Sequence, residues 1–327
     1  MTAFILRRIG LMIPMLIAVS FVSFVIIQLP PGDFMTTLQA QTAETGGGMT
    51  NELADLLRQT YGLDRPFLEQ FVGWVDGFPS GDFGYSFEWT SPVWPLISDR
   101  LAYTVLLGVA SLSIMFVLAI PIGIYSATHQ YSFGDAALSA AAFIGLSLPG
   151  FLLALVWLYF GAVILRLPVT GTLSPQFQDV PLSLAKLLDY LAHFIPPALI
   201  LGLASTAQLM RIMRSGMLDV LNQQYITTAR AKGLKEGKVI NKYAVRSALN
   251  PVVSVVAMEV PKIISASILI GVVLSVPTTG PLFLRSLLSQ DMFLAGTFLL
   301  MMALMQLVAN LIADILLAWL DPRIAYT

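Results

Sequence analysis

Long runs without a charged residue are the feature that most constrains how this chain of 327 residues can fold. Ile9–Leu29, Leu101–Ala127 and Ala136–Leu165 contain 21, 27 and 30 consecutive residues with no Asp, Glu, Lys or Arg. A helix that crosses a bilayer needs about 20 apolar residues, whereas a cleavable signal peptide has an apolar region of about 7–15. Each run is therefore long enough to span a membrane, and we expect the first to be retained.

Composition agrees with this expectation. The chain is 57% hydrophobic and only 11% charged, against roughly 25% charged residues in soluble domains. Three further crossings are predicted at Leu191–Met210, Val252–Val276 and Met292–Leu320. The sequence thus predicts an all-α polytopic membrane protein with six transmembrane helices.

The distribution of charge predicts which ends of these helices face the cytoplasm. Arg7 and Arg8 precede the first crossing, and the segment Arg211–Arg246 carries eight basic residues against two acidic ones. Basic residues are enriched in cytoplasmic loops. The stretch Pro30–Arg100 has ten acidic and three basic residues, as expected on the outer side. We therefore predict cytoplasmic N- and C-termini, with residues 1–29 as the N-terminus and first helix, 30–100 as an extracytoplasmic helical insertion and 101–327 as the core. The core would contain a cytosolic loop at 211–250.

Two amphipathic helices are predicted in the extracytoplasmic insertion. The first covers Glu52–Tyr61 and ends at Gly62, and the second starts after Asp64 with Pro66 in its first turn. The second helix has an aromatic face, which consists of Phe67, Phe71, Trp74 and Phe78. We expect both helices to pack on the outer ends of the membrane helices.

Polar or helix-breaking residues interrupt three of the predicted crossings. Pro149-Gly150 divides the third, where we favour a kink over an unwound substrate site. Glu259 and Lys262 lie three residues apart in the fifth, on one helical face. Each ion would cost about 2.5–3.5 kcal/mol at the bilayer centre. They are either residues of a translocation path or subunit interface, or a structural pair. The sixth crossing carries a polar stripe of Gln306, Asn310 and Asp314, which either lines a pathway or joins two helices.

The cytosolic loop contains a polar, basic stretch that predicts two short helices. Its sequence is QYITTARAKGLKEGKVINKYAVRSALNP. The first has about nine residues, with Tyr225, Thr228, Ala229 and Lys232 on one face, and Gly233 ends it. The second, Lys238–Leu249, is expected to stop at Pro251. Isolated helices need roughly 12–15 residues to be stable in water, so the first helix needs a surface to pack against. We interpret it as a docking element, with a basic loop held by lipid headgroups as the alternative.

The same stretch resembles a motif of a known protein family. TTARAKGL, closing on LNP, resembles the EAA loop of permease subunits in ABC-type importers, and TARAKG is similar to the dipeptide/oligopeptide/nickel branch. Thr227 and Thr228 stand where that family has glutamate and its first alanine, and Gly233 is in register. Weaker similarity covers nearly the whole chain, including GDFGYSFEWTSPVWPLISDRL, Pro277–Pro281 and the tail Asp321–Arg323. For the outer segment the resemblance leaves two roles open, docking of a substrate-delivery protein and structural packing, and we favour packing. The resemblance implies a coupling helix that inserts into an ATPase subunit through Tyr225, Thr227, Thr228, Ala229, Arg230, Ala231, Lys232, Gly233 and Leu234.

The resemblance also implies partners and a location: a second homologous permease, two ATPase subunits, an extracytoplasmic binding protein and the bacterial inner membrane. ATP and Mg would be bound by the partner ATPases, and no cofactor is expected in this chain. The chain has no cysteine, P-loop, HExxH or GxSxG motif, so neither catalysis nor a metal site is expected. No nucleic-acid partner is needed, because positive-inside bias explains the basic loop.

One alternative function remains, a secondary transporter or channel that uses Glu259, Lys262 or Asp314. It would leave the TARAKG loop unexplained. The implied substrates of the branch are peptides, nickel, glutathione or opines, and selection among them would rest with the binding protein.

Overall fold

The structure is a computed structural model that describes residues 2–44, 49–167 and 169–320. The tail Asp321–Arg323 lies outside these residues. The regular secondary structure of the described residues is helical, apart from a small antiparallel pairing of β1 (Tyr85–Ser86) with β2 (Ser91–Pro92). It divides into two compact units. We call residues 2–103 with 278–307 the N-terminal unit, and residues 104–277 with 308–320 the core unit.

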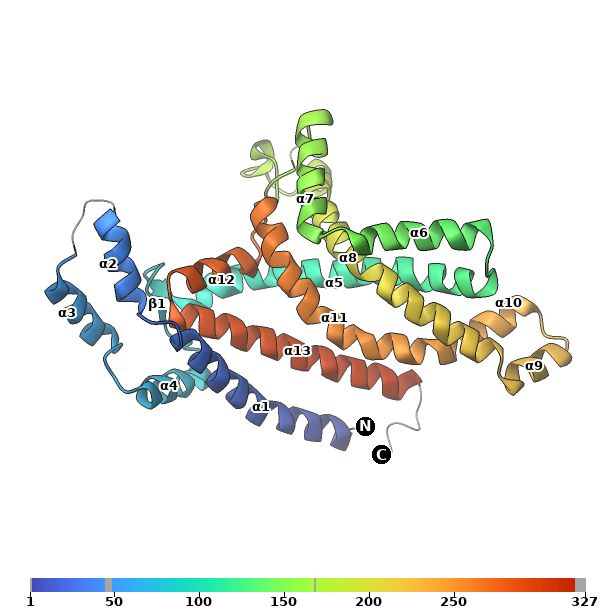
Figure 1. Cartoon of the computed structure of the whole chain (residues 1–327), viewed down its shortest axis with the longest axis horizontal. Coiled ribbons are helices and arrows are strands. Elements are labelled where there is room, and N and C mark those ends of the chain that lie inside the picture. Colours follow the sequence, from blue (N-terminus) through green and yellow to red (C-terminus); the bar gives the residue numbers. More distant parts are fainter. Residues whose placement is uncertain (1, 45–48, 168, 321–327) are drawn as a thin grey trace. The chain divides into compact units, whose positions relative to one another are not determined.

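Figure 1 shows the elements of both units. The N-terminal unit contains α1 (Thr2–Gln28), α2 (Phe34–Glu44), α3 (Asn51–Tyr61), α4 (Phe67–Asp76), η1 (Phe78–Ser80), β1, β2 and α12 (Thr279–Leu288). The core unit contains α6 (Phe133–Ser147), α7 (Gly150–Tyr159), η2 (Phe160–Ile164), η3 (Pro175–Phe177), α8 (Leu184–Leu221), α9 (Gln224–Ala231), α10 (Glu236–Lys238), η4 (Val239–Ala244) and α11 (Val245–Val273). Two long helices, α5 (Val93–Thr128) and α13 (Met292–Leu320), have residues in both units.

Four described helices are long and apolar enough to cross a membrane: Ile5–Gln28, Val93–Thr128, Leu184–Leu221 and Met292–Ala318. Two bent helix pairs, Phe133–Ser147 with Gly150–Ile164 and Glu236–Val255 with Met258–Val273, raise the number to six if each pair is one span. The all-α, polytopic fold class is confirmed. The six-helix topology and the sidedness of the termini stay predictions.

The third predicted crossing is broken more sharply than a kink. α6 and α7 meet at 95°, with Leu148 and Pro149 between them. A proline disfavours the helical conformation of the residue before it, and Leu148 is accordingly extended, with φ −95° and ψ 129°. The helix therefore ends before the proline and a new helix starts at Gly150. A kink was expected at this point, and the structure shows a complete break between two helices.

The predicted stop at Pro251 is also wrong. The helix that begins near Lys238 continues through Pro251 to Val273. A proline inside a helix removes one backbone hydrogen bond, which a membrane helix tolerates when neighbours pack against it. Here α8 supplies the neighbour at Gly216, whose missing Cβ would lie 3.3 Å from the Ala248 carbonyl oxygen and 3.6 Å from Pro251 Cγ.

The N-terminal unit is built around an aromatic cluster. Phe24 of α1 stacks on Trp74 of α4 at a centroid distance of 5.5 Å, and Phe21 lies edge-on to Phe71 at 5.3 Å. Edge-to-face and offset-stacked rings at such distances are the preferred aromatic geometries. The aromatic face of the second amphipathic helix therefore packs against α1, a candidate membrane span, and its place at the outer end of that span stays a prediction.

The ends of the two predicted outer helices follow their capping residues. Gly62 ends α3 with φ 68°, as expected, and Thr50 caps its first turn by accepting from the Leu53 backbone N–H. α4 starts at Phe67, so Pro66 is its N-cap residue and lies one position before the first turn. The helices α2 and α12 were not predicted.

In the core unit, small residues allow long helices to approach closely. A Cβ on Gly202 of α8 would lie 2.7 Å from the Ser111 carbonyl oxygen of α5, and one on Gly123 of α5 would lie 2.7 Å from Met213 Cβ. Met213 and Met217 are fully buried in the cluster beneath this contact. Close packing at small residues is the usual device where lipid offers helices no hydrophobic drive to associate.

Acid is expected to destabilise the N-terminal unit through one ion pair. Arg58 of α3 holds Asp33, with its Nε atom 2.8 Å from Oδ2 and its Nη2 atom 3.2 Å from Oδ1. Burial alone would raise the pKa of Asp33, but hydrogen bonds from Arg58 and Thr36 outweigh it and lower the pKa to about 2. A carboxyl with a lowered pKa stabilises the fold above its ordinary pKa, and that contribution is lost as the pH falls through the folded value.

Unfolding temperatures measured from about pH 5 down to about pH 2 test this expectation, since the contribution should disappear across that interval. Asp33→Asn should flatten the pH dependence in this range. The control is Asp64→Asn, because Asp64 is exposed and is not among the ion-pair partners of Arg58. An unchanged pH profile in Asp33→Asn would contradict the role of the ion pair.

Candidate coupling site and membrane charge pair

The predicted coupling residues form a short helix that the structure anchors at one end of α8 and α11 (Figure 1). α9 has eight residues, and Lys232 is its C-cap residue. Gly233 follows with φ 73°, and its N–H donates to the Arg230 carbonyl oxygen at 2.9 Å. Glycine adopts this left-handed conformation without steric cost. The prediction that Gly233 ends the helix is confirmed.

One side of α9 is held by the protein itself. Ile226 is fully buried and Ala229 is 6% exposed, and both belong to the hydrophobic cluster that includes Met217, Val239 and Ala244. The exposed side carries the other predicted docking residues, which are Tyr225, Thr227, Thr228, Arg230, Ala231, Lys232 and Gly233, with Leu234 half-buried. The face predicted from Tyr225, Thr228, Ala229 and Lys232 is therefore divided. Ala229 points into the core unit, three residues along the helix from Ile226.

An internal ion pair fixes the turn between α9 and α10. Arg230 Nη2 lies 2.6 Å from Glu236 Oε1, and its Nε lies 3.2 Å from Glu236 Oε2. The hydrogen bonds from Arg230 lower the pKa of Glu236 below its ordinary value. Tyr225 Oη also lies 3.3 Å from Ser247 Oγ of α11. These two side-chain contacts hold the segment in addition to its buried residues.

The segment that follows α10 joins it to α11 without a loop. η4 is a π-helical turn, and its Val239 and Ala244 side chains are fully buried. π-Helical turns arise mostly as short insertions within α-helices. A short turn, residues 232–235, therefore separates α9 from a continuous helical backbone that runs from Glu236 to Val273.

Glu259 and Lys262 form an ion pair in α11. Lys262 Nζ lies 2.8 Å from Glu259 Oε1. The Glu259 side chain is 1% exposed and that of Lys262 is 51% exposed. Within the described residues, Glu259 Oε2 is buried without a hydrogen-bond partner. The pair is an observation, and its place on a pathway or interface stays a prediction.

The pair lies beside a bend. The two segments of α11 that meet between Val255 and Met258 are inclined by 50°. Pro261 lies just beyond this point, and a proline ring clashes with the carbonyl group four residues earlier. Pro261 therefore accounts for the position of the bend.

The polar stripe lies on α13. Gln306, Asn310 and Asp314 are half-buried and, at intervals of four, share one helical face. Their proposed role beside a pathway stays a prediction.

Sequence reasoning missed a further ion pair at the start of α6. Arg214 Nη2 of α8 lies 2.9 Å from Oδ2 of Asp135, which also accepts from the Tyr131 backbone N–H. Ser132 caps the helix by accepting from the Asp135 N–H. The pattern Ser-x-x-Asp before an apolar run is a capping signal and would have located this turn.

Together, the apolar helices, the anchored helix α9 and the Glu259–Lys262 pair indicate a polytopic integral membrane protein. The comparisons with known proteins make the class specific. The chain matches the family model of the binding-protein-dependent transport system inner membrane component over residues 119–326, and the model of the N-terminal part of such components over residues 1–108. The chain belongs to this family, that of the inner-membrane permease subunits of ABC importers.

Two relatives illustrate the branch. The chain is 36% identical to the oligopeptide transport system permease protein AppB of Bacillus subtilis (strain 168), over all of both chains. It is 32% identical to the dipeptide transport system permease protein DppB of Escherichia coli (strain K12), over all of this chain and 99% of the relative. The resemblance to the peptide branch of ABC importer permeases is confirmed.

Proposed function

We propose that this permease subunit forms part of the translocation pathway of an ATP-driven importer and is moved by separate ATPase subunits through α9. The observation that carries the proposal is the division of α9 into an anchored side and an exposed side. Ile226 and Ala229 fix the helix to the core unit, and Tyr225, Thr228 and Lys232 are left on the surface. A rigidly held, exposed helix is suited to insertion into a groove of a partner.

The proposed assembly has a second homologous permease, two ATPase subunits and an extracytoplasmic binding protein. The family supports it, since its description states dependence on a binding protein. The chain would cross the inner membrane six times with both termini in the cytoplasm. ATP and Mg would bind the partner subunits, so this chain would hold no cofactor. The relatives' names favour a peptide or related small solute as substrate.

In this mechanism the ATPase subunits move on nucleotide binding and hydrolysis, and α9 receives the motion. The continuous helical backbone of α10, η4 and α11 carries it to the bend beside Glu259 and Lys262. We place this pair and the Gln306, Asn310 and Asp314 stripe at the pathway or at the contact with the second permease. Ion pairs and polar stripes inside a membrane face protein or water.

Reconstitution in liposomes tests the proposal against the alternative of a secondary transporter or channel. The chain alone should give no solute flux, whereas the assembly with its ATPases and binding protein should give uptake that needs ATP. Saturable uptake by the isolated chain, abolished by Asp314→Asn, would instead establish the transporter or channel and end the proposal.

A further inference from the structure

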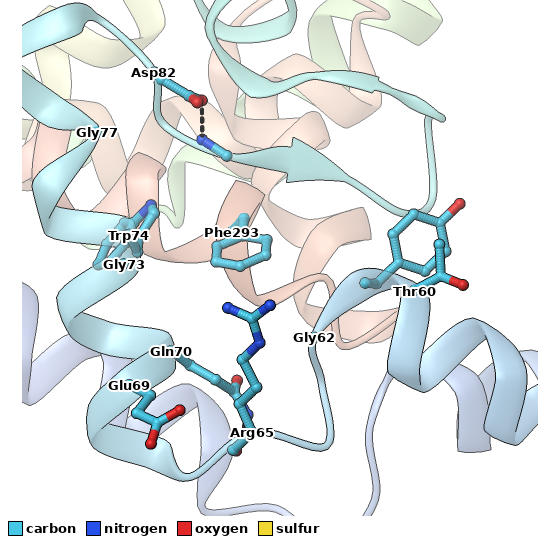
Figure 2. Close-up of a pocket in the computed structure, with 12 residues that line it drawn as sticks. Thr60, Gly62, Arg65, Glu69, Gln70, Gly73, Trp74, Gly77, Asp82 and Phe293 are labelled. Atoms are coloured by element: carbon cyan, nitrogen blue, oxygen red, sulfur yellow. Dashed lines mark hydrogen bonds between the residues drawn. The ribbon is translucent and has the colours of Figure 1, made fainter.

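A pocket of about 280 Å³ lies in the N-terminal unit, between α3, α4, the segment that precedes β1 and the first turn of α13 (Figure 2). Its lining residues are Thr60, Tyr61, Gly62, Arg65, Glu69, Gln70, Gly73, Trp74, Gly77, Asp82, Gly84 and Phe293. Most come from the segment 30–100, which we expect on the outer side of the membrane. Nothing in the proposed function yet uses this pocket.

The polar groups of the pocket wall are largely satisfied within the chain. Trp74 Nε1 donates to the Phe83 carbonyl oxygen at 3.0 Å, and Gln70 Nε2 donates to the Arg65 carbonyl oxygen at 2.7 Å. Asp82 Oδ1 accepts from the Gly84 N–H at 2.9 Å. These groups therefore have little capacity left for a ligand.

The Arg65 guanidinium group is different. Figure 2 shows it pointing into the pocket toward Phe293, while the Glu69 carboxylate points away. Within the residues that the structure describes, no carboxylate lies within ion-pair distance of Arg65. A guanidinium group presents N–H donors in a planar fork that matches the two oxygens of a carboxylate. Arg65 is thus the group in this pocket that is available to recognise a ligand.

Glycines keep the pocket open. A Cβ on Gly77 would lie 2.5 Å from the Asp82 carbonyl oxygen, and one on Gly84 would lie 2.9 Å from Phe293 Cγ. Glycine at these two positions therefore lets the segments that form the pocket wall pack against each other. A Cβ on Gly73 would meet nothing within 4 Å. A side chain at Gly73 would consequently extend into space on the helix face that lines the pocket.

We propose that this pocket receives a carboxylate side chain from the extracytoplasmic binding protein and that Arg65 pairs with it. The inference rests on the proposed function, which supplies the binding protein. Small-molecule pockets usually measure roughly 300–1,000 Å³, so this one suits a single projecting side chain better than a whole transported peptide. An aromatic floor of Trp74 and Phe293 beneath one arginine also matches the residue types that dominate binding at protein interfaces.

The test uses the complete importer in liposomes, with its binding protein added at increasing concentration. Arg65→Gln removes the positive charge, and Gly73→Leu fills the pocket while replacing glycine by a better helix former. Each variant should raise the half-saturating concentration of binding protein by about tenfold, the scale of one lost charge-assisted hydrogen-bonded pair. Val72→Leu is the matched control, because Val72 is exposed on α4 and does not line the pocket.

Unchanged half-saturation in Arg65→Gln would overturn the inference. It would also be overturned if Arg65→Gln weakened solute uptake at saturating binding protein while leaving half-saturation unchanged, because the pocket would then act on the solute. Loss of folding in Gly73→Leu is detected by Trp fluorescence, and Gly73→Ser then serves as the milder variant. Failure of the proposed function is distinguishable, since the unmodified importer would then show no response to binding protein at all.

Discussion

Lys262→Met is expected to lower the stability of the protein by about 3–5 kcal/mol, the usual cost of leaving a buried charge without its partner. The cost arises at Glu259, whose side chain is 1% exposed and whose ion-pair partner is Lys262. Without the ammonium group, the carboxylate would remain buried and uncompensated. The opposite change should cost less, because in Glu259→Gln the remaining Lys262 is half exposed and can reach water along its flexible stem.

Unfolding of the purified protein in detergent measures both changes, and a double variant supplies the control. Glu259→Gln combined with Lys262→Met removes both charges and should recover most of the stability lost in Lys262→Met alone. If the double variant recovers stability and also shows normal uptake, Glu259 and Lys262 are a structural pair. Stable single variants with altered uptake would instead place the two residues on the pathway.

Gly233→Leu is expected to uncouple ATP hydrolysis from transport. Gly233 has φ 73°, and a left-handed conformation costs other residues roughly 1–2 kcal/mol. A Cβ there would meet nothing within 4 Å, so the effect comes from the backbone and not from a clash. The turn after α9 should therefore relax to another conformation and change how Lys232 and the exposed side of the helix are presented. Membrane insertion should persist, while uptake per ATP hydrolysed falls by an order of magnitude or more.

Two matched variants separate backbone strain from side-chain bulk. Gly233→Asn should retain much of the coupling, since asparagine tolerates the left-handed region. Gly237→Leu places the same leucine four residues away, in α10, where the glycine has no positive φ and a Cβ would meet open space. Equal uptake in Gly233→Leu and Gly237→Leu, at equal ATPase rates, would refute the role of this turn.

Features set by a single residue's conformation were predictable from the sequence. Gly62 and Gly233 were correctly expected to end helices, because only glycine readily follows a helix with a positive φ. The long helices formed by the apolar runs were predictable too, because a chain that spans hydrocarbon must satisfy its backbone hydrogen bonds internally, as a helix does. The candidate coupling helix lies within one residue of its predicted length.

Features that depend on neighbouring helices were not predictable. Proline gave opposite results at Pro149 and Pro251: the first separates two helices and the second lies within one. The difference at Pro251 is the support of α8 at Gly216, which sequence spacing does not reveal. Ala229 was placed on the outward face for the same reason, since the periodicity of an eight-residue helix does not indicate which side is covered. The Arg65 pocket depends on the approach of α3, α4, the segment before β1 and α13, and it has no local sequence signature.

The uninterrupted backbone from Glu236 to Val273 has a mechanical consequence. Helical segments of this length resist compression and bending far more than a loop does, and at 1.5 Å per residue α11 alone is about 43 Å long. A push on the end of this segment nearest α9 would therefore be passed along the helix with little loss. The 50° bend beside Pro261 is then the first place where this helix can deform. Stiffening that bend should therefore affect transport more than lengthening any loop.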